Sequence, residues 1–323
     1  KIKNNIHLIF NEGDSVTTWV NFCINVINNK YNTNPIYVSH AHNDTQDTQY
    51  TQDTQYTQDT QDICNNTSNT LSKNTSLDAN NIPKIIHFIY FGYTEYTFIH
   101  YFAIKTAYDN NPNYKIFLYN YTQPSHNKWW ELTKQYVEIV YTEPPEEIFS
   151  HKLNNFAHKA DIIRLQKLIE YGGIYLDIDI WTIKSYDTLL NTNKSCIMGY
   201  QASNTQFEGL CNAVIIAKPQ SNFLKIWLEN YKNFNNTEWD KHSVYLPLEL
   251  SKIHSELIEI KTQEAFFPVS WWEFDDLFKK DNTTQLTNSY CIHLWESHLM
   301  ETLLKKMNPI YFNIFDTPIS HTF

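Results

Sequence analysis

The chain contains little glycine, no dense run of lysine or arginine, and no apolar stretch as long as a membrane-spanning helix. Only 6 of its 323 residues are glycine, and none lies in a basic, glycine-rich loop of the kind that cradles phosphates. The net charge of −10 argues against a nucleic-acid partner, because neutralising a phosphate backbone requires a basic face. The apolar runs fall short of the roughly 20 residues of a membrane span, so none is expected in this chain.

The 5 cysteines form no regular pattern; they are Cys23, Cys64, Cys196, Cys211 and Cys291. Neither a zinc-type pairing nor a disulfide framework is visible in their spacing. This usage favours a reducing compartment, and therefore a cytoplasmic location. The chain starts at Lys1 rather than at methionine, so a secretory lumen is the alternative if an upstream anchor has been removed.

Composition divides the chain into three parts. Residues 1–40 read as a small β-α-β-like segment that is too short to bury a core of its own. Residues 41–80 read as a linker, because Thr45–Asp62 repeats the unit Thr-Gln-Asp-Thr-Gln-Tyr without any aliphatic residue. Such a repeat cannot build a core and is predicted to be disordered. Residues 81–323 form the main domain, and the 42% of hydrophobic residues in the chain is ample for a packed core.

In the main domain, predicted strands alternate with predicted helices. This alternation predicts an α/β domain with a parallel sheet wrapped by helices, and a nucleotide site at the carboxyl ends of the strands. The predicted strands are 85–90, 114–119, 137–141 and 209–218, and the predicted helices are 97–109, 129–135, 221–231 and 246–258.

The stretch 155–181 organises the rest of the domain. Apolar residues recur three and four positions apart from Phe156 onward, which predicts a helix buried on nearly all sides. One polar stripe interrupts them, because Asp161 and Arg164 are three residues apart and are therefore neighbours on the helix. Gly172 and Gly173 then permit the backbone angles that end the helix and turn the chain into the sheet.

After the glycine pair the period changes to two. Alternation predicts a strand with Tyr175, Asp177 and Asp179 on one face, and with apolar residues on the other. Two carboxylates on one side of a strand repel each other unless a positive charge lies between them. Hard carboxylate oxygens suit Mg²⁺ or Mn²⁺, so this pair predicts a divalent cation site.

An Asp-x-Asp by itself would indicate only two solvated carboxylates, but the longer pattern is distinctive. From Ala160 to Asp179 the chain reads A-D-x-x-R-x-x-x-L-x-x-x-G-G-x-Y-x-D-x-D. This pattern resembles the signature of the DXD-type glycosyltransferases. By pattern it is most similar to glycosyltransferase family 32, which includes the initiating mannosyltransferases, and to the catalytic domains of the clostridial glucosylating toxins. The opening strand, IPKIIHFIYFG, is similar to the first strand of the same proteins.

The resemblance implies a GT-A-type fold over residues 81–323, with a mostly parallel central sheet flanked by helices. It also implies a metal-dependent, retaining glycosyltransferase that moves a hexose from a UDP- or GDP-hexose. The acceptor would be a glycan, a protein or another hydroxyl compound. The cofactor would be Mn²⁺, or Mg²⁺, on Asp177 and Asp179, stabilising the charge of the leaving diphosphate.

Several roles follow from the resemblance, each beside a plainer structural reading. Asp161 and Arg164 match the positions that bind the donor sugar, or they form a buried salt bridge. Tyr175 would orient the two aspartates or the phosphate. Tyr90 would stack on the base of the donor, where the toxins have tryptophan, or it is a core aromatic residue. Asn212 would reach the donor or the acceptor, or cap a turn.

The C-terminal part contributes two further candidates. His293 and Trp295 match a His-x-Trp element of the family, which makes His293 the candidate third metal ligand or phosphate contact; the alternative is a structural histidine. The Ser-Trp pair that follows in the family is replaced by His298 and Leu299. The neighbouring Trp271 and Trp272 are either core residues or a platform for sugar stacking.

Two rival functions stay open at this point. The first is a non-catalytic protein that binds sugars or nucleotide sugars through a decayed site. A decayed site would be expected to have lost one of its residues, whereas Asp161, Arg164, Asp177 and Asp179 are all present. The second is another carboxylate–metal enzyme, such as a nucleotidyltransferase, which a glycine-rich phosphate loop would favour.

Overall fold

A computed structural model describes residues 80–91, 95–124, 127–202, 209–273 and 288–299, together with the single residues 286, 307, 309 and 319. All of them lie in the second of the two compact units into which the chain divides, residues 64–323. The segment predicted over residues 1–40 and the repeat-containing linker predicted over 41–80 fall outside the described residues, apart from Asn80.

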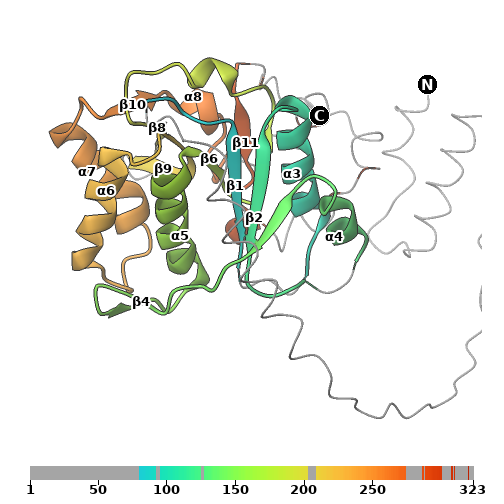
Figure 1. Ribbon diagram of the computed structural model, residues 1–323, viewed down its shortest axis with the longest axis horizontal. Helices are drawn as coiled ribbons and strands as arrows, with labels where there is room; N and C mark the ends of the chain where they lie inside the picture. Colours follow the sequence, from blue (N-terminus) through green and yellow to red (C-terminus); the bar gives the residue numbers. More distant parts are fainter. Residues whose placement is uncertain are drawn as a thin grey trace, which may run out of the picture. The chain divides into compact units, whose positions relative to one another are not determined.

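A seven-stranded sheet forms the centre of the described part, with the strand order β10-β8-β9-β6-β1-β2-β3 (Figure 1). The sheet is mostly parallel, and β9 is the strand that runs antiparallel to both of its neighbours. The strands are β1 (Ile85–Tyr90), β2 (Lys115–Asn120), β3 (Glu138–Tyr141), β6 (Gly173–Leu176), β8 (Cys196–Gln201), β9 (Gly209–Ala217) and β10 (Ile258–Lys261).

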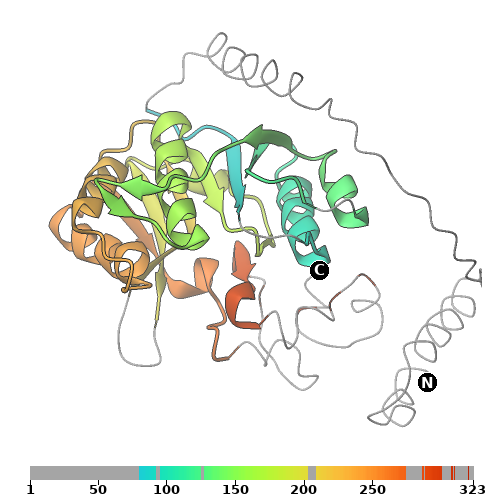
Figure 2. The same cartoon turned by 90° about the horizontal axis from the view of Figure 1, so that it is seen from below.

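Two small antiparallel sheets accompany the large one. β4 (Glu147–Ile148) pairs with β5 (His151–Lys152), and β7 (Ile180–Thr182) pairs with β11 (Cys291–His293). In the second pair, His293 lies opposite Ile180. Figure 2 shows β11 beside the short helix α8 (Gln263–Phe266). The C-terminal strand therefore returns to the residues that follow β6.

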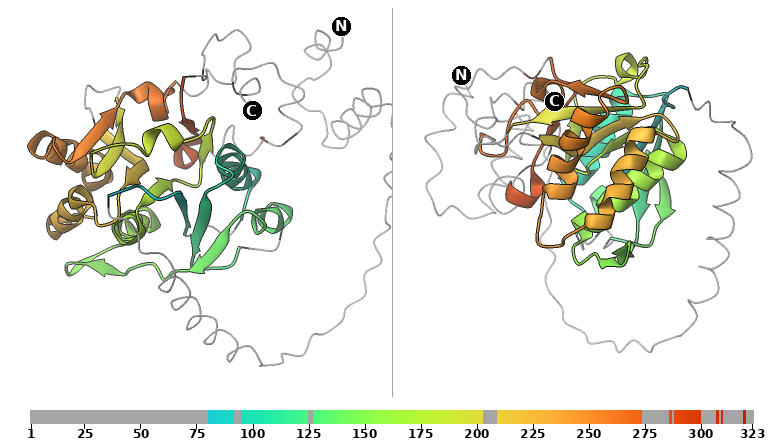
Figure 3. Two further views of the ribbon diagram at one scale, coloured as in Figure 1. Left: turned by 45° about the horizontal axis from the view of Figure 1, so that its top comes forward. Right: turned by 90° about the vertical axis from the view of Figure 1, so that its left-hand side faces the viewer.

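Helices cover both faces of the sheet, because the buried strands carry apolar side chains on both faces. α3 (Phe98–Asn110), α4 (Lys128–Thr133), α8 and the pair β7–β11 contribute to one hydrophobic core. α5 (Phe156–Tyr171), α6 (Asn222–Glu229) and α7 (Leu246–Ile253) contribute to the other. Figure 3 shows α5 and α6 side by side on their face. A short helix α9 (Glu296–Leu299), a π-helix (Lys241–Tyr245) and two 3₁₀ turns (Asp187–Leu189, Asn230–Asn233) complete the described elements.

The helix–glycine–strand junction forms as the sequence predicts. α5 ends where the backbone N–H of Gly172 donates to Leu168, with φ of 66° at Gly172 and 102° at Gly173. A Cβ atom on Gly173 would lie 2.5 Å from the backbone oxygen of Ile85, so β6 could not pair with β1 at this point if residue 173 had a side chain. The glycine therefore serves both the turn and the close approach of two strands.

Two predictions about elements were wrong. The strand predicted to carry both Asp177 and Asp179 is interrupted, because β6 ends at Leu176 and β7 begins at Ile180. Residues 177–179 form a turn in which the N–H of Ile180 donates to the carbonyl of Asp177, 2.9 Å away. The helix predicted over 246–258 ends at Ile253, since Ile258 begins β10 and pairs with Cys196 of β8.

Candidate active site and metal centre

The carboxyl end of β6 borders a cavity of about 650 Å³. Ligand sites of α/β proteins form at this end of parallel strands, because the connecting loops diverge there. Most of the residues predicted to be functional line this cavity. They are Asp161, Arg164, Tyr175, Asp177, Asp179, Asn212 and His293, from α5, β6, the turn after β6, β9 and β11.

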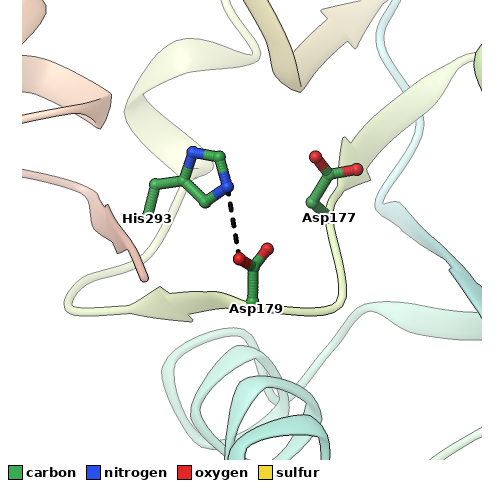
Figure 4. A group of neighbouring side chains, drawn as sticks. All are labelled: Asp177, Asp179 and His293. Carbon is green, nitrogen blue, oxygen red and sulfur yellow. Dashed lines mark ion pairs between the residues drawn. The ribbon is translucent and has the colours of Figure 1, made fainter. Parts of the chain in front are cut away.

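Asp177, Asp179 and His293 form a group that suits a divalent cation. Each offers one ligand atom, and these atoms all lie within 4.8 Å of one another (Figure 4). The turn between β6 and β7 presents the two carboxylates, and β11 brings the imidazole from the other end of the domain. Carboxylate oxygens and an imidazole nitrogen together form a ligand set typical of Mn²⁺ or a similar transition metal. The structure therefore brings together the three residues that the sequence predicted as candidate metal ligands.

The His293–Asp179 contact is electrostatically strong. Nε2 of His293 lies 3.3 Å from Oδ2 of Asp179, and both side chains are buried. Burial acts to lower the pKa of His293, but the Asp179 carboxylate outweighs it and raises that pKa to about 10. Burial likewise acts to raise the pKa of Asp179, and the imidazolium holds it below its usual value. The imidazolium therefore supplies the positive charge beside Asp179, whereas a cation bound by these residues would supply that charge itself and require His293 to be neutral.

The polar stripe of α5 forms a buried network with β9. Asp161 Oδ1 accepts from Nδ2 of Asn212 at 2.7 Å and lies 3.1 Å from Nη2 of Arg164. Arg164 Nη1 also donates to the backbone carbonyl of Asn212 at 2.8 Å. Burial raises the pKa of Asp161 even though the Arg164 guanidinium beside it acts in the opposite direction. Asn212 therefore holds Asp161 from β9, rather than capping a turn.

Arg164 links this network to the proposed metal ligands. Its Nη1 lies 3.0 Å from Oδ1 of Asp177, and its guanidinium carbon lies 4.4 Å from the centre of the Tyr175 ring. The Tyr175 hydroxyl donates to the same Asp177 oxygen at 2.6 Å. Both contacts use Oδ1, so they fix the orientation of the Asp177 carboxylate from one side. Asp161 and Arg164 can therefore form a salt bridge and still belong to a ligand site, because the Arg164 guanidinium pairs with both Asp161 and Asp177, and all three residues line the cavity.

Tyr90 is the predicted site residue that does not line the cavity. Its ring has 1% of its surface exposed and packs edge-on against Tyr96 and His100, while its hydroxyl donates to the carbonyl of Glu95. Stacking on a base would require this ring to leave the core. Phe91, the next residue, does line the cavity.

Glu296 is a site residue that the sequence did not single out. Its backbone N–H donates to Oδ2 of Asp179 at 2.8 Å, and its buried carboxylate lies 2.8 Å from Nε2 of His100 on α3. The contact partners of Glu296 are 117 and 196 residues away in the chain. No local pattern signals such contacts; the only sequence clue is its position directly after the His-x-Trp element.

Tryptophans form part of the cavity wall. Trp271 and Trp272, which the sequence left between core and platform, line the cavity together with Trp239 and Trp295. Phe156 also lines it and is exposed, although the helical spacing placed it among the buried residues of α5. Its position at the first turn of α5, beside the cavity, accounts for this difference.

The mostly parallel sheet and the helices on both faces confirm the α/β architecture that the sequence predicted, and the acidic turn at the end of β6 carries the Asp-x-Asp of the predicted GT-A-type fold. Residues 100–196 match the family described as "Glycosyltransferase sugar-binding region containing DXD motif", and residues 216–317 match "Alpha 1,4-glycosyltransferase conserved region". The chain belongs to the DXD-motif glycosyltransferases.

Curated relatives agree with this membership. The chain is 34% identical over 248 residues to "Glucan organizing enzyme 1" of Cryptococcus neoformans var. grubii serotype A, a match that covers 71% of this chain and 66% of that protein. It is 26% identical over 165 residues to the mouse "Lactosylceramide 4-alpha-galactosyltransferase", covering 45% of this chain and 43% of the mouse protein. The chain thus spans just under two thirds of the fungal relative and less than half of the mouse one.

Among solved structures, the "PaToxG Glycosyltransferase" is similar, with a TM-score of 0.38 and 18% identity over 59% of this chain and 76% of that one.

In the part of the chain that the structure describes, no helix is long and apolar enough to cross a membrane. Cys196, Cys211 and Cys291 are buried free thiols. Family membership sets aside the nucleotidyltransferase alternative.

Proposed function

We propose that this chain is a metal-dependent, retaining glycosyltransferase that moves a hexose from a UDP- or GDP-hexose to a hydroxyl of an acceptor. The observation that carries the proposal is the meeting of Asp177, Asp179 and His293 in the same cavity as the Asp161–Arg164 pair. A decayed, non-catalytic site would be expected to have lost one of these residues. All five are present, and each lines the cavity.

Asp177, Asp179 and His293 are the residues that would hold Mn²⁺ or Mg²⁺. The imidazole favours Mn²⁺ over Mg²⁺, which prefers an all-oxygen shell. A cation bound there supplies positive charge to the diphosphate as the bond to the sugar breaks. On the protein side, Tyr175 and Arg164 hold Oδ1 of Asp177, and the N–H of Glu296 holds Oδ2 of Asp179. Each carboxylate therefore retains an oxygen with which to face the cavity.

Asp161, Arg164 and Asn212 are assigned to the donor sugar. Asp161 lies in the cavity wall with Oδ1 held by Asn212 and Arg164, so its orientation is set before any ligand binds. A carboxylate accepts hydrogen bonds from sugar hydroxyls, and the guanidinium and the amide can donate to their oxygens. A prearranged acceptor and donor pair of this kind suits a hexose better than a free phosphate, because the guanidinium is already shared by two carboxylates.

Retention of the anomeric configuration is proposed from two considerations. The name of the mouse relative specifies an α linkage in its product, and common hexose donors such as UDP-galactose are themselves α-linked. Among the described residues, Asp161 and Asp177 are held by Arg164, and Asp179 is held by His293, so we assign none of them as a covalent nucleophile. In this proposal the leaving phosphate accepts the proton of the acceptor hydroxyl.

The test is titration calorimetry with a panel of UDP- and GDP-hexoses, with Mn²⁺ or with a chelator, followed by donor hydrolysis under the same conditions. We expect saturable binding and slow hydrolysis of one donor, both dependent on Mn²⁺. Asp177→Asn should weaken Mn²⁺-dependent donor binding by about tenfold to a hundredfold. Asp187→Asn is the matched control, because Asp187 is a surface carboxylate paired with Lys84 and is not part of the cavity wall.

Donor binding that is equally tight in the chelator, or unchanged in Asp177→Asn, would refute the metal assignment. Binding without any hydrolysis or transfer would favour the non-catalytic alternative. Proton NMR of the transferred sugar distinguishes retention from inversion, since the coupling constant of the anomeric proton differs between α- and β-galactosides or glucosides.

A further inference from the structure

We propose that the indole rings of Trp239, Trp271 and Trp272 form the acceptor subsite of this cavity, and that the acceptor they bind is an uncharged saccharide. This inference rests on the proposed glycosyl transfer and deepens it by naming the class of the acceptor.

The exposure of these tryptophans is unusual within the described chain. Trp239 is 57% exposed and Trp271 is 39% exposed, whereas Trp181 and Trp227 are completely buried. Leaving an indole in water forgoes the stabilisation that burial of so large an apolar surface provides. Trp239 and Trp271 are distant in sequence, yet both line the same cavity. Large exposed aromatic rings that gather at one cavity indicate a binding surface rather than a core.

The rings come from two separate segments of the chain, and each segment has its own contacts. Trp271 and Trp272 are nearly perpendicular, with ring centroids 5.6 Å apart, and follow Val269 closely in the chain. The carbonyl of Val269 accepts from Nε1 of Trp295 at 3.2 Å, and the Trp295 ring lies 4.0 Å from that of His293. The indole pair is therefore tied to the metal-ligand side of the cavity.

Trp239 packs against α5. Its ring centroid is 5.4 Å from that of His158, which precedes Asp161 by three residues on α5 and is therefore adjacent to it on the helix. A saccharide that contacts these rings would lie in the same cavity as the Asp177–Asp179–His293 group. This is where an acceptor hydroxyl must lie to reach the donor sugar.

The charge of the wall decides which kind of acceptor fits. Among the residues that the structure describes, the cavity lining includes five carboxylates, one arginine and no lysine; the carboxylates are Asp161, Asp177, Asp179, Asp240 and Glu296. The arginine, Arg164, is already bonded to Asp161 and Asp177. In the described part of this wall, an anionic acceptor would find no guanidinium or ammonium group that is not already paired with a carboxylate. Hydroxyl groups of a neutral sugar would find amide and hydroxyl partners in Gln201, Ser243 and Tyr245.

Aromatic faces beside amide and hydroxyl groups match a pyranose, which has apolar C–H faces and a polar hydroxyl rim. An acidic peptide does not match the charge of the described wall. A glycolipid would present the same kind of neutral sugar at its head, so the structure assigns the sugar and not what is attached to it.

The experiment compares Trp239→Ala, Trp271→Ala and the conservative Trp271→Phe with the wild-type chain. The probes are lactose and a neutral gluco-oligosaccharide of six residues, with an acidic oligogalacturonate as the comparator. Tyr141→Ala is the matched control, because Tyr141 is 59% exposed on β3 and is not part of the cavity wall. Saccharide binding is measured by tryptophan fluorescence in the presence of Mn²⁺ and UDP or GDP, and donor hydrolysis is measured in parallel.

We expect each alanine variant to weaken binding of at least one neutral probe by about tenfold, the loss typical of removing one stacked ring. Trp271→Phe should retain most of the affinity, since it keeps an aromatic face. Tyr141→Ala should bind as the wild type does. Tyr141→Ala should leave donor binding and donor hydrolysis unchanged. In each tryptophan variant the loss in saccharide binding should exceed any loss in donor hydrolysis, because the rings are assigned to the acceptor.

Four results would overturn the assignment. Unchanged saccharide binding in both alanine variants, or no saturable binding of a neutral probe by the wild type, would show that the rings are not an acceptor subsite. Tighter binding of the oligogalacturonate would refute the neutral class. Equal losses in donor hydrolysis and saccharide binding would place the rings at the donor. Failure of the proposed function appears separately, as a wild-type chain that binds no UDP- or GDP-hexose.

Discussion

Replacing Arg164 with methionine tests the electrostatics of the cavity most directly. The side chains are similar in length, so Arg164→Met removes the charge and its hydrogen bonds while leaving much of the packing in place. In the wild-type chain the guanidinium lies 3.1 Å from Asp161 and 3.0 Å from Asp177. The substitution affects the two carboxylates differently, because they differ in exposure to water. The side chain of Asp177 is 26% exposed and stays partly hydrated, whereas Asp161 is buried.

The expected cost follows from that difference. Breaking a buried ion pair by removing one partner typically costs about 3–5 kcal/mol, because the remaining charge is left without water or a counter-charge. For a folded unit of this size, that loss lowers the melting temperature by about 6–20 °C. Asp161 should account for most of it, since Asn212 can offer Asp161 a hydrogen bond but not a charge.

The loss of stability in Arg164→Met should depend on pH, and the pKa of Asp161 determines the direction of this dependence. Burial already raises the pKa of Asp161, and loss of the guanidinium raises it further in the folded variant. A carboxyl with a raised pKa destabilises the folded state above its unfolded pKa, and protonation relieves the penalty as the pH falls. The deficit of Arg164→Met relative to the wild type should therefore be largest near pH 8 and should shrink toward pH 5.

The assay is urea unfolding followed by tryptophan fluorescence, at pH 8 and at pH 5, for the wild type and three variants. Asp161→Asn and the double variant Arg164→Met/Asp161→Asn complete a double-mutant cycle. The double variant should be more stable than Arg164→Met alone, with a coupling of at least about 1 kcal/mol, because no buried charge is left unpaired. A deficit below 1 kcal/mol in Arg164→Met, a deficit equal at both pH values, or an additive cycle would refute this reasoning.

Two further predictions concern the frame of the site. Gly173→Ala places a Cβ 2.5 Å from the Ile85 carbonyl oxygen at a φ of 102°, so it should destabilise the chain by about 2–5 kcal/mol in urea unfolding; a loss below 1 kcal/mol would contradict the strained junction. Burial lowers the pKa of His87 from 6.5 to about 4, so the unfolded chain binds a proton in this window that the folded chain does not. Stability should therefore fall by up to about 3 kcal/mol as the pH drops from 6.5 to 4, with a shallower dependence in His87→Gln; the same slope in both chains would refute it.

The local sequence pattern was sufficient to predict the secondary structure that carries most of the site. The spacing of apolar residues along α5, the glycine pair and the alternation after it predict a helix, a sharp turn and a strand, and the structure contains them in that order. These features depend on neighbours within a few residues, which the sequence displays directly. The pattern failed at the next step, because periodicity cannot indicate that the chain leaves the main sheet after Leu176 and re-pairs elsewhere from Ile180.

The family resemblance identified His293 as a candidate metal ligand, which the periodicity of the sequence could not do. A His-x-Trp element near the C-terminus marks a candidate ligand, but its distance from Asp179 follows from the pairing of β11 with β7. The same resemblance suggested a role for Tyr90 that the tertiary packing does not favour. The ring at this strand end is enclosed by residues of the following loop and helix, Tyr96 and His100.

The sequence by itself determined the family, the two acidic residues of the proposed metal site and the Asp161–Arg164 stripe, because the residues that define each of them lie close together in the chain. Only the tertiary structure decided that one guanidinium serves both Asp161 and Asp177, that Glu296 supports Asp179 from 117 residues away, and that tryptophans from two separate segments share one cavity. The physical reason is that charge pairing and burial depend on which surfaces the packed sheet and helices bring together. A one-dimensional pattern records the spacing of residues along an element, but not the element that will lie against it.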